Sequence, residues 1–182
     1  MKIVVIFETQ NQALFSFKYD DEEIDELDRL FDQWQDIEYL EDFFTRNRSD
    51  LTSGFFGKIS IEEAVLQTRK DAKELQKQFL AIEESDENNP LYLNSYFKPL
   101  DNITYKQNEL EKTKAYGIIE NSWLRLYAIR VPENYFIITG GTIKLTRTMR
   151  ERSHTQNELD RLDNCLAFLR ANGIFDEDAI RD

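Results

Sequence analysis

Residues 122–159 read SWLRLYAIRVPENYFIITGGTIKLTRTMRERSHTQNEL and hold the clearest pattern in the chain. Residues 123–131 alternate in polarity, which predicts a strand with one buried side. One side carries Leu124, Leu126 and Ala128, and the other carries Trp123, Arg125, Tyr127 and Ile129. Residues 132–134 suit a turn, residues 135–139 return as a second strand, and the Gly-Gly pair that follows permits a bulge. The stretch therefore predicts an antiparallel hairpin.

A basic loop follows this hairpin at residues 146–154. The loop carries Arg147, Arg150, Arg152 and His154, the only histidine, and Lys144 lies two residues before the loop. Thr155 and Glu158 then match a capping box, which predicts that the last helix begins there. We expect the chemistry of the chain to lie at this loop.

The N-terminal half predicts a second hairpin and several helices. Residues 2–7 and 13–19 read as its two strands, and helical spacing begins near residues 24, 37 and 60. Ser60 and Glu63 form another capping box. A polar stretch at residues 85–90 separates the halves. We expect an acidic hairpin and helices at 1–84, a linker with a short helix at 85–97, and a sheet with a C-terminal helix at 98–182, packed as one unit.

Composition limits the classes of function. The chain has 182 residues and one cysteine, which excludes an intramolecular disulfide and a cysteine-rich zinc cluster. No signal peptide or long apolar run occurs, so the expected location is cytoplasmic, without a membrane partner. The usual nucleotide-binding and hydrolase motifs are missing, and no cofactor is expected. A carboxylate-bound magnesium ion stays possible with 35 acidic residues, although no spacing favours it.

Charge is unevenly distributed along the chain. The net charge is −12, which argues against nucleic acid as a partner. Residues 98–152, however, hold 10 basic and 6 acidic residues, a net charge of +4. The acidic residues outside this segment can serve solubility alone, or they can discourage nonspecific binding of nucleic acid.

Two interpretations of the basic middle segment remain open. Arginines contact phosphates in bidentate fashion and exposed aromatics stack on unpaired bases, so Trp123, Arg125, Tyr127 and Lys144 suit single-stranded RNA. Alternatively, both aromatics are buried under a helix and Arg125 pairs with an acid. His154 is either a helix-entry residue or a general acid or base, because it alone titrates near neutrality.

The segment from residue 98 to about 173 resembles the C-terminal part of the RelE/ParE toxin superfamily, in particular its HigB-type branch. The similar features are KPL at 98–100, WLRLYAIR at 123–130, YFIITGGTIKLT at 135–146 and an amphipathic helix that starts with Glu-Leu. The chain differs from that family in its acidic N-terminal part and in the insertion at residues 147–154.

The resemblance implies an α+β fold in which helices precede an antiparallel sheet that a C-terminal helix closes. From the many apolar side chains of the N-terminal part we expect its hairpin and helices to pack on one face of this sheet. The resemblance also implies the toxin of a bacterial toxin–antitoxin pair, a metal-independent endoribonuclease that cleaves mRNA on the ribosome and binds a small antitoxin protein. Family positions carry over to Arg125, Arg130 and Lys144. We add Arg147, Arg150, Arg152 and His154 from the loop.

Such cleavage needs a base, an acid and cations that stabilise the phosphorane. We expect Arg125 and Lys144 to supply charge, His154 to carry protons, and the remaining arginines, with Trp123 and Tyr127, to bind RNA. The competing hypothesis is a non-catalytic interaction module of the same fold that binds a protein or single-stranded RNA.

Overall fold

The computed structural model describes residues 1–53, 55–100, 110–119, 121–132 and 134–181. The strands in these ranges are β1 (Lys2–Thr9), β2 (Gln12–Lys18), β3 (Lys98–Pro99), β4 (Glu111–Tyr116), β5 (Leu124–Val131) and β6 (Tyr135–Ile143). The helices are α1 (Glu26–Gln35), α2 (Ile37–Arg46), α3 (Arg48–Thr52), α4 (Ile61–Glu83), α5 (Ser153–Ala171) and α6 (Glu177–Arg181), with short 3-10 helices η1 (Leu93–Ser95) and η2 (Met149–Glu151). The fold is α+β, as the sequence predicts.

The strands form a single mixed sheet in the order β1-β2-β6-β5-β4-β3. The predicted hairpins β1–β2 and β5–β6 are both antiparallel and are confirmed. The prediction that the N-terminal hairpin packs on a face of an antiparallel sheet is wrong, because β2 pairs in parallel with β6 and extends the sheet sideways. All of β2 except its last residue is buried, as expected of a strand that lies inside a sheet.

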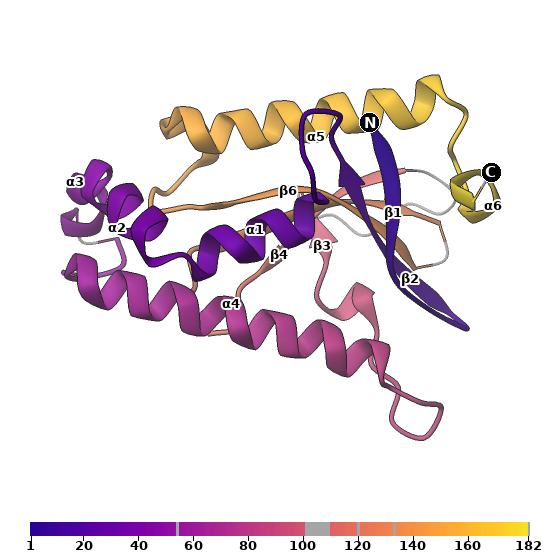
Figure 1. Ribbon diagram of the computed structural model, residues 1–182, viewed down its shortest axis with the longest axis horizontal. Coiled ribbons are helices and arrows are strands. Elements are labelled where there is room, and N and C mark those ends of the chain that lie inside the picture. The colour runs from indigo at the N-terminus through magenta and orange to yellow at the C-terminus, as the bar shows by residue number, and fades with distance from the viewer. Residues whose placement is uncertain (54, 101–109, 120, 133, 182) are drawn as a thin grey trace.

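Helices cover both faces of the sheet (Figure 1). Helices α1 and α4 lie on one side and α5 lies on the other. Strand β5 shows the consequence: Leu124, Leu126 and Ala128 join the apolar cluster of α1 and α4, whereas Tyr127 and Ile129 join the cluster of α5. The prediction of one buried side for β5 is therefore wrong.

A bulge interrupts the β5–β6 pairing where the sequence places Gly140 and Gly141. Tyr127 pairs with Gly140 and Ala128 pairs with Ile138, so that Thr139 is the extra residue. This bulge confirms the prediction from the Gly-Gly pair. The predicted turn at residues 132–134 includes residue 133, which lies outside the described residues.

The two predicted capping boxes have different outcomes. Ser60 caps α4 together with Glu63, as predicted. Helix α5 begins at Ser153, two residues before the predicted start, and Thr155 is fully buried inside its first turn. The Thr155 hydroxyl donates to the carbonyl oxygens of Met149 and Arg152, and so it does not act as an N-cap.

Contacts join the predicted segments 1–84 and 98–182. Trp123 Nε1 donates to Thr68 Oγ1 of α4 over 2.9 Å, and the Ser122 hydroxyl donates to the Asp71 carboxylate. In the predicted linker, the Leu93 amide donates to the side-chain oxygen of Gln12 over 2.7 Å. No helix in the described part of the chain is long and apolar enough to cross a membrane.

Candidate functional site

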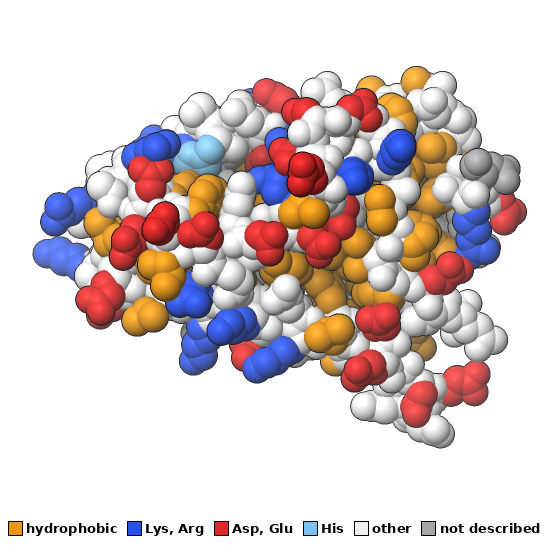
Figure 2. Space-filling model, in the orientation of Figure 1, with side chains coloured by type: hydrophobic (Ala, Val, Ile, Leu, Met, Phe, Trp, Pro, Cys, Tyr) orange, Lys and Arg blue, Asp and Glu red, His pale blue; other side chains and the backbone are white. Residues whose placement is uncertain are grey.

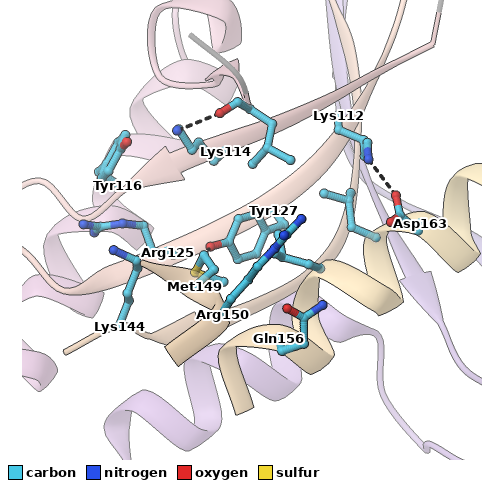
Figure 3. Close-up of a pocket in the computed structure, with 13 residues that line it drawn as sticks. Lys112, Lys114, Tyr116, Arg125, Tyr127, Lys144, Met149, Arg150, Gln156 and Asp163 are labelled. Carbon is cyan, nitrogen blue, oxygen red and sulfur yellow. Dashed lines mark hydrogen bonds and ion pairs between the residues drawn. The ribbon is translucent and has the colours of Figure 1, made fainter. Parts of the chain in front are cut away.

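A cavity of about 420 Å³ opens between β4, β5 and the first turns of α5 (Figure 3). Its wall carries five basic side chains: Lys112, Lys114, Arg125, Lys144 and Arg150. They come from β4, β5, the end of β6 and η2, so sheet pairing brings together residues that lie far apart in the sequence. We call this the basic cavity.

Arg125 is held with its guanidinium facing the basic cavity. Its Nη1 donates to the carbonyl oxygens of Ser122 over 2.9 Å and Leu124 over 2.7 Å. The guanidinium lies 4.2 Å from the centre of the Tyr116 ring, a cation–π contact. Burial lowers the pKa of Arg125, but an arginine stays charged at neutral pH. The site therefore contains a preoriented positive charge.

Lys144 is anchored in a similar way. Its Nζ donates to the carbonyl oxygens of Thr146 over 2.8 Å and Arg147 over 2.7 Å. An ammonium group has three N–H donors, so one of them stays available for a ligand. Burial lowers the pKa of Lys144, and the positive charge of Arg125 lowers it further. An anion bound between the two cations would relieve their repulsion.

The other two lysines border the opposite side of the basic cavity. Lys112 Nζ lies 2.6 Å from a carboxylate oxygen of Asp163, and Lys114 Nζ donates to the Leu100 carbonyl oxygen over 2.8 Å. Asp163 is the one carboxylate among the described lining residues, and this ion pair engages it. Five cations against one carboxylate give the basic cavity a strong preference for anions.

The two tyrosines of the basic cavity differ in accessibility. Tyr127 is 1% exposed and its hydroxyl lies 3.0 Å from Met149 Sδ, so it forms the floor and offers no free ring face. Burial raises the pKa of its phenol, which stays neutral. Tyr116 is 43% exposed at the end of β4. Tyr116 is therefore the aromatic ring that a ligand can reach.

Trp123 lies away from the basic cavity. It is 1% exposed and its ring makes edge contacts with Phe44 and Phe56 in the cluster under α2 and α4. For Trp123 the structure agrees with the alternative in which the aromatic is buried under helices, and a role in base stacking is excluded by its burial.

The remaining predicted arginines also lie outside the described wall of the basic cavity. Arg152 Nε donates over 2.8 Å to the buried carboxylate of Asp50 and so ties the start of α5 to α3. Arg130 lies 3.8 Å from Glu111 on the neighbouring strand. Arg147 is exposed in the loop. Of the predicted RNA-binding residues, the structure brings Tyr127 and Arg150 to the cavity.

His154 faces α2 and does not line the basic cavity. Its Nε2 lies 3.1 Å from the Ile143 carbonyl oxygen, and its ring meets the edge of Phe43 at 5.3 Å. Because a carbonyl oxygen only accepts, Nε2 carries the proton of the neutral ring. Burial lowers the pKa of His154, which favours that neutral form. The predicted proton carrier is thus separated from Arg125 and Lys144.

Sequence reasoning missed Lys112, Lys114, Tyr116 and Asp163. The pattern from residue 101 to 120 is weak, so no strand face could be assigned there. The spacing of Lys112, Lys114 and Tyr116 by two residues is nevertheless the signal of a common strand face.

Among the described residues no three His, Cys, Asp or Glu side chains gather as a metal-binding group. No protein-family model, curated protein or solved structure matches the chain.

Proposed function

We propose that the chain binds single-stranded RNA, with a backbone phosphate held in the basic cavity between Arg125, Lys144 and Arg150. One observation carries the proposal: cations from four separate elements converge on one cavity in a chain whose net charge is −12. Burial of Arg125 costs solvation free energy, which an anionic ligand offsets. Guanidinium and ammonium groups are the side chains that phosphates prefer.

The shape of the basic cavity favours an unpaired strand. A volume of about 420 Å³ suits a small group such as one nucleotide, whereas a duplex presents its phosphates on a wide convex surface. The exposed ring of Tyr116 adjoins the phosphate site and offers a surface on which an unpaired base can stack. The Arg125 guanidinium lies over this ring, 4.2 Å from its centre.

We further propose that the bound RNA is cleaved without a metal ion, as the RelE/ParE resemblance implies. The RNA 2′-hydroxyl would lose its proton to water and its oxygen would attack the adjacent phosphorus, while the bond from phosphorus to the 5′-oxygen breaks. Arg125 and Lys144 would stabilise the negative charge that develops on the phosphorane. The products would be a 2′,3′-cyclic phosphate and a 5′-hydroxyl, which takes its proton from water. In this proposal the chain is the toxin of a toxin–antitoxin pair in the cytoplasm and acts on mRNA at the ribosome. His154 has no part in it, because it lies outside the cavity.

A non-catalytic RNA-binding module is the second candidate. One observation favours it: the described wall of the basic cavity holds no imidazole, and its carboxylate, Asp163, is engaged by Lys112. Proton transfer therefore lacks an evident base. A basic protein as partner has weaker support, since Figure 2 shows acidic side chains spread among basic and apolar ones over the face of α1 and α4.

The test compares the Arg125→Ala, Lys144→Ala double variant with wild type. We expect at least about tenfold weaker binding of an RNA oligonucleotide, because hydrogen bonds to charged groups contribute about 1.5–3 kcal/mol each. Loss of charge stabilisation should lower transcript cleavage by ~10²-fold or more. Arg170→Ala, which removes an exposed charge near the far end of α5, is the control and should behave as wild type.

Three measurements separate the hypotheses. Oligonucleotide binding by the purified protein tests the RNA proposal, and binding that the double variant retains in full would contradict it. Growth arrest and transcript cleavage on induction test the toxin proposal. Binding without cleavage would favour the non-catalytic module.

A further inference from the structure

A buried ionic cluster lies where α5 meets α1, beside the end of the β2–β6 pairing. The parallel register of β2 and β6 ends at Ser16 and Ile138. Beyond it, the Tyr19 hydroxyl donates to the Thr139 carbonyl oxygen over 2.7 Å, and the side chain of Glu158 lies against Gly140. Side chains therefore take the place of the neighbouring strand along this part of β6.

Two arginines in the cluster form ion pairs with Glu26. Glu26 is 1% exposed, and Arg29 Nε donates to its Oε2 over 2.8 Å while Arg161 Nη1 donates to its Oε1 over 2.7 Å. The negative charge of the Glu158 carboxylate is balanced less well by nearby positive groups. Arg161 Nη1 lies 3.7 Å from Glu158 Oε1, and the buried Glu158 Oε2 has no hydrogen-bond partner among the described residues.

The position of Glu158 connects this cluster to the basic cavity. A Cβ added at Gly140 would collide with Glu158 Oε2, so the carboxyl lies directly on β6. Gly140 is the register partner of Tyr127, which forms the floor of the basic cavity. The same turn of α5 that holds Glu158 supplies Gln156 and Leu159 to the cavity wall. The carboxyl is therefore one strand away from the floor of the basic cavity.

We infer that Glu158 is a proton-binding group linked to the basic cavity, which binds an anion more tightly when Glu158 is neutral than when it is ionised. The inference rests on the proposed function, because it concerns the regulation of the same site. A negative charge beside the floor opposes an anion bound above it, and the burial of Glu158 and Tyr127 weakens the screening of this repulsion. By linkage, a bound anion favours the protonated carboxyl to the same extent.

The surroundings of Glu158 support titration near neutral pH. Burial raises the pKa of Glu158 to about 7, and Glu26 acts in the same direction. Arg161, Arg29 and a hydrogen bond from the Gly141 backbone oppose this rise. The ordinary value is 4.5, so the buried carboxyl takes up its proton at a much higher pH than an exposed one.

The other titratable groups that face Glu158 stay in one form across this range. They are Tyr19 before α1, Tyr39 on α2, Tyr127 on β5 and Cys165 on α5. Burial raises the pKa of each of the three tyrosines, and it raises the pKa of Cys165 to about 11. All four groups are therefore neutral across this range.

The binding test uses a fluorescent 2′-O-methyl oligouridine, which carries phosphates and cannot be cleaved through a 2′-hydroxyl. Wild type and Glu158→Gln are titrated at fixed low salt from about pH 5.5 to 8.5. We expect the wild-type affinity to fall on the order of fivefold between the acid and alkaline limits, the lower end of usual coupling strengths. The affinity of Glu158→Gln should stay near the acid limit. If the affinity of Glu158→Gln depends on pH as strongly as that of wild type, the inference is overturned.

A control and a second readout separate the possible failures. His154→Gln should keep the wild-type profile, which assigns the pH dependence to Glu158. The melting temperature is measured without RNA over the same pH range. Because folding raises the pKa of Glu158, the protonated form stabilises the folded state below about pH 4.5, and this stabilisation is lost as the pH rises through about 7. Wild type should match Glu158→Gln near pH 5 and melt below it near pH 8.

These two readouts give distinct outcomes. Melting curves that run parallel for wild type and Glu158→Gln overturn the inference, even if RNA binds. Absence of oligonucleotide binding at every pH, with melting temperatures that still diverge, overturns the proposed function and leaves Glu158 as a proton-binding group.

Discussion

At the scale of single residues, Arg125 and Trp123 lie two positions apart in the sequence but on opposite faces of the sheet. Arg125, Lys144 and Arg150 were expected at the site and line the basic cavity. Trp123 was expected to stand beside Arg125, but it precedes the first residue of β5, so strand alternation does not govern its direction. Asn121, two residues earlier, has a positive φ of 59°, which redirects the chain there. Local pattern cannot reveal such a turn.

Tyr116 and Trp123 should therefore respond differently to truncation. Tyr116→Ala should weaken binding of a single-stranded oligonucleotide about tenfold, since stacking of a base on an aromatic ring contributes ~1–3 kcal/mol. Its melting temperature should change little, because the ring is 43% exposed. Tyr116→Phe keeps the ring and should bind as wild type does.

Trp123→Ala is the contrasting variant in this prediction. It should lower the free energy of unfolding by about 3–5 kcal/mol, as for other buried large-to-small changes. Fluorescence anisotropy and urea unfolding measure the two effects. Unchanged oligonucleotide binding by Tyr116→Ala would remove Tyr116 from the proposed site.

At the scale of elements, η2 and the first turn of α5 form one border of the basic cavity. Thr148 and Glu151 make a capping box around η2, a short helix that the sequence did not reveal. The Thr155 hydroxyl links η2 to α5 through the carbonyl oxygens of Met149 and Arg152. A pattern of Thr followed by Glu three residues later occurs twice within this stretch. The sequence alone cannot decide which of the two pairs makes the cap.

Thr155→Val tests this link with a side chain of nearly the same shape. The variant leaves the Met149 carbonyl oxygen without its hydroxyl donor, while the Arg152 carbonyl oxygen still accepts from the Gln156 amide, and this loss should cost about 1–3 kcal/mol of unfolding free energy. Thr155→Ser keeps the hydroxyl and is the matched control. Urea unfolding measures both variants. Equal stability of Thr155→Val and wild type would show that the hydroxyl does not hold η2 against α5.

At the scale of the whole molecule, the sequence predicts the elements better than their arrangement. Both hairpins and the long capped helix α4 lie close to their expected ranges. Each is set by local chemistry: alternation, turn residues and a capping box. The parallel pairing of β2 with β6 joins segments about 120 residues apart and depends on which strand edges are available after the hairpins form. No local pattern specifies that choice, and so the hairpin was placed on the sheet instead of within it.

The mixed sheet leads to a prediction about how the two halves hold together. The polar stretch at residues 86–90 is exposed, so a protease should cleave there first. The cut separates β1, β2, α1, α2 and α4 from the strands β3 to β6 and α5. These two pieces share the β2–β6 pairing and an apolar cluster that contains Trp34 and Phe79 from one side and Trp123 and Phe136 from the other.

The cleaved chain should therefore stay associated under native conditions. Separating the pieces would expose large aromatic side chains, each of which gains about 1.5–3 kcal/mol from full burial. It would also leave an edge of β6 unpaired, which costs backbone hydrogen bonds. Limited proteolysis followed by size exclusion measures the association, and the cleaved protein should elute as one species at the volume of the intact chain. The same sample in urea is the control and should give two fragments. Two separate folded peaks without denaturant would mean that residues 1–84 and 98–182 are independent domains.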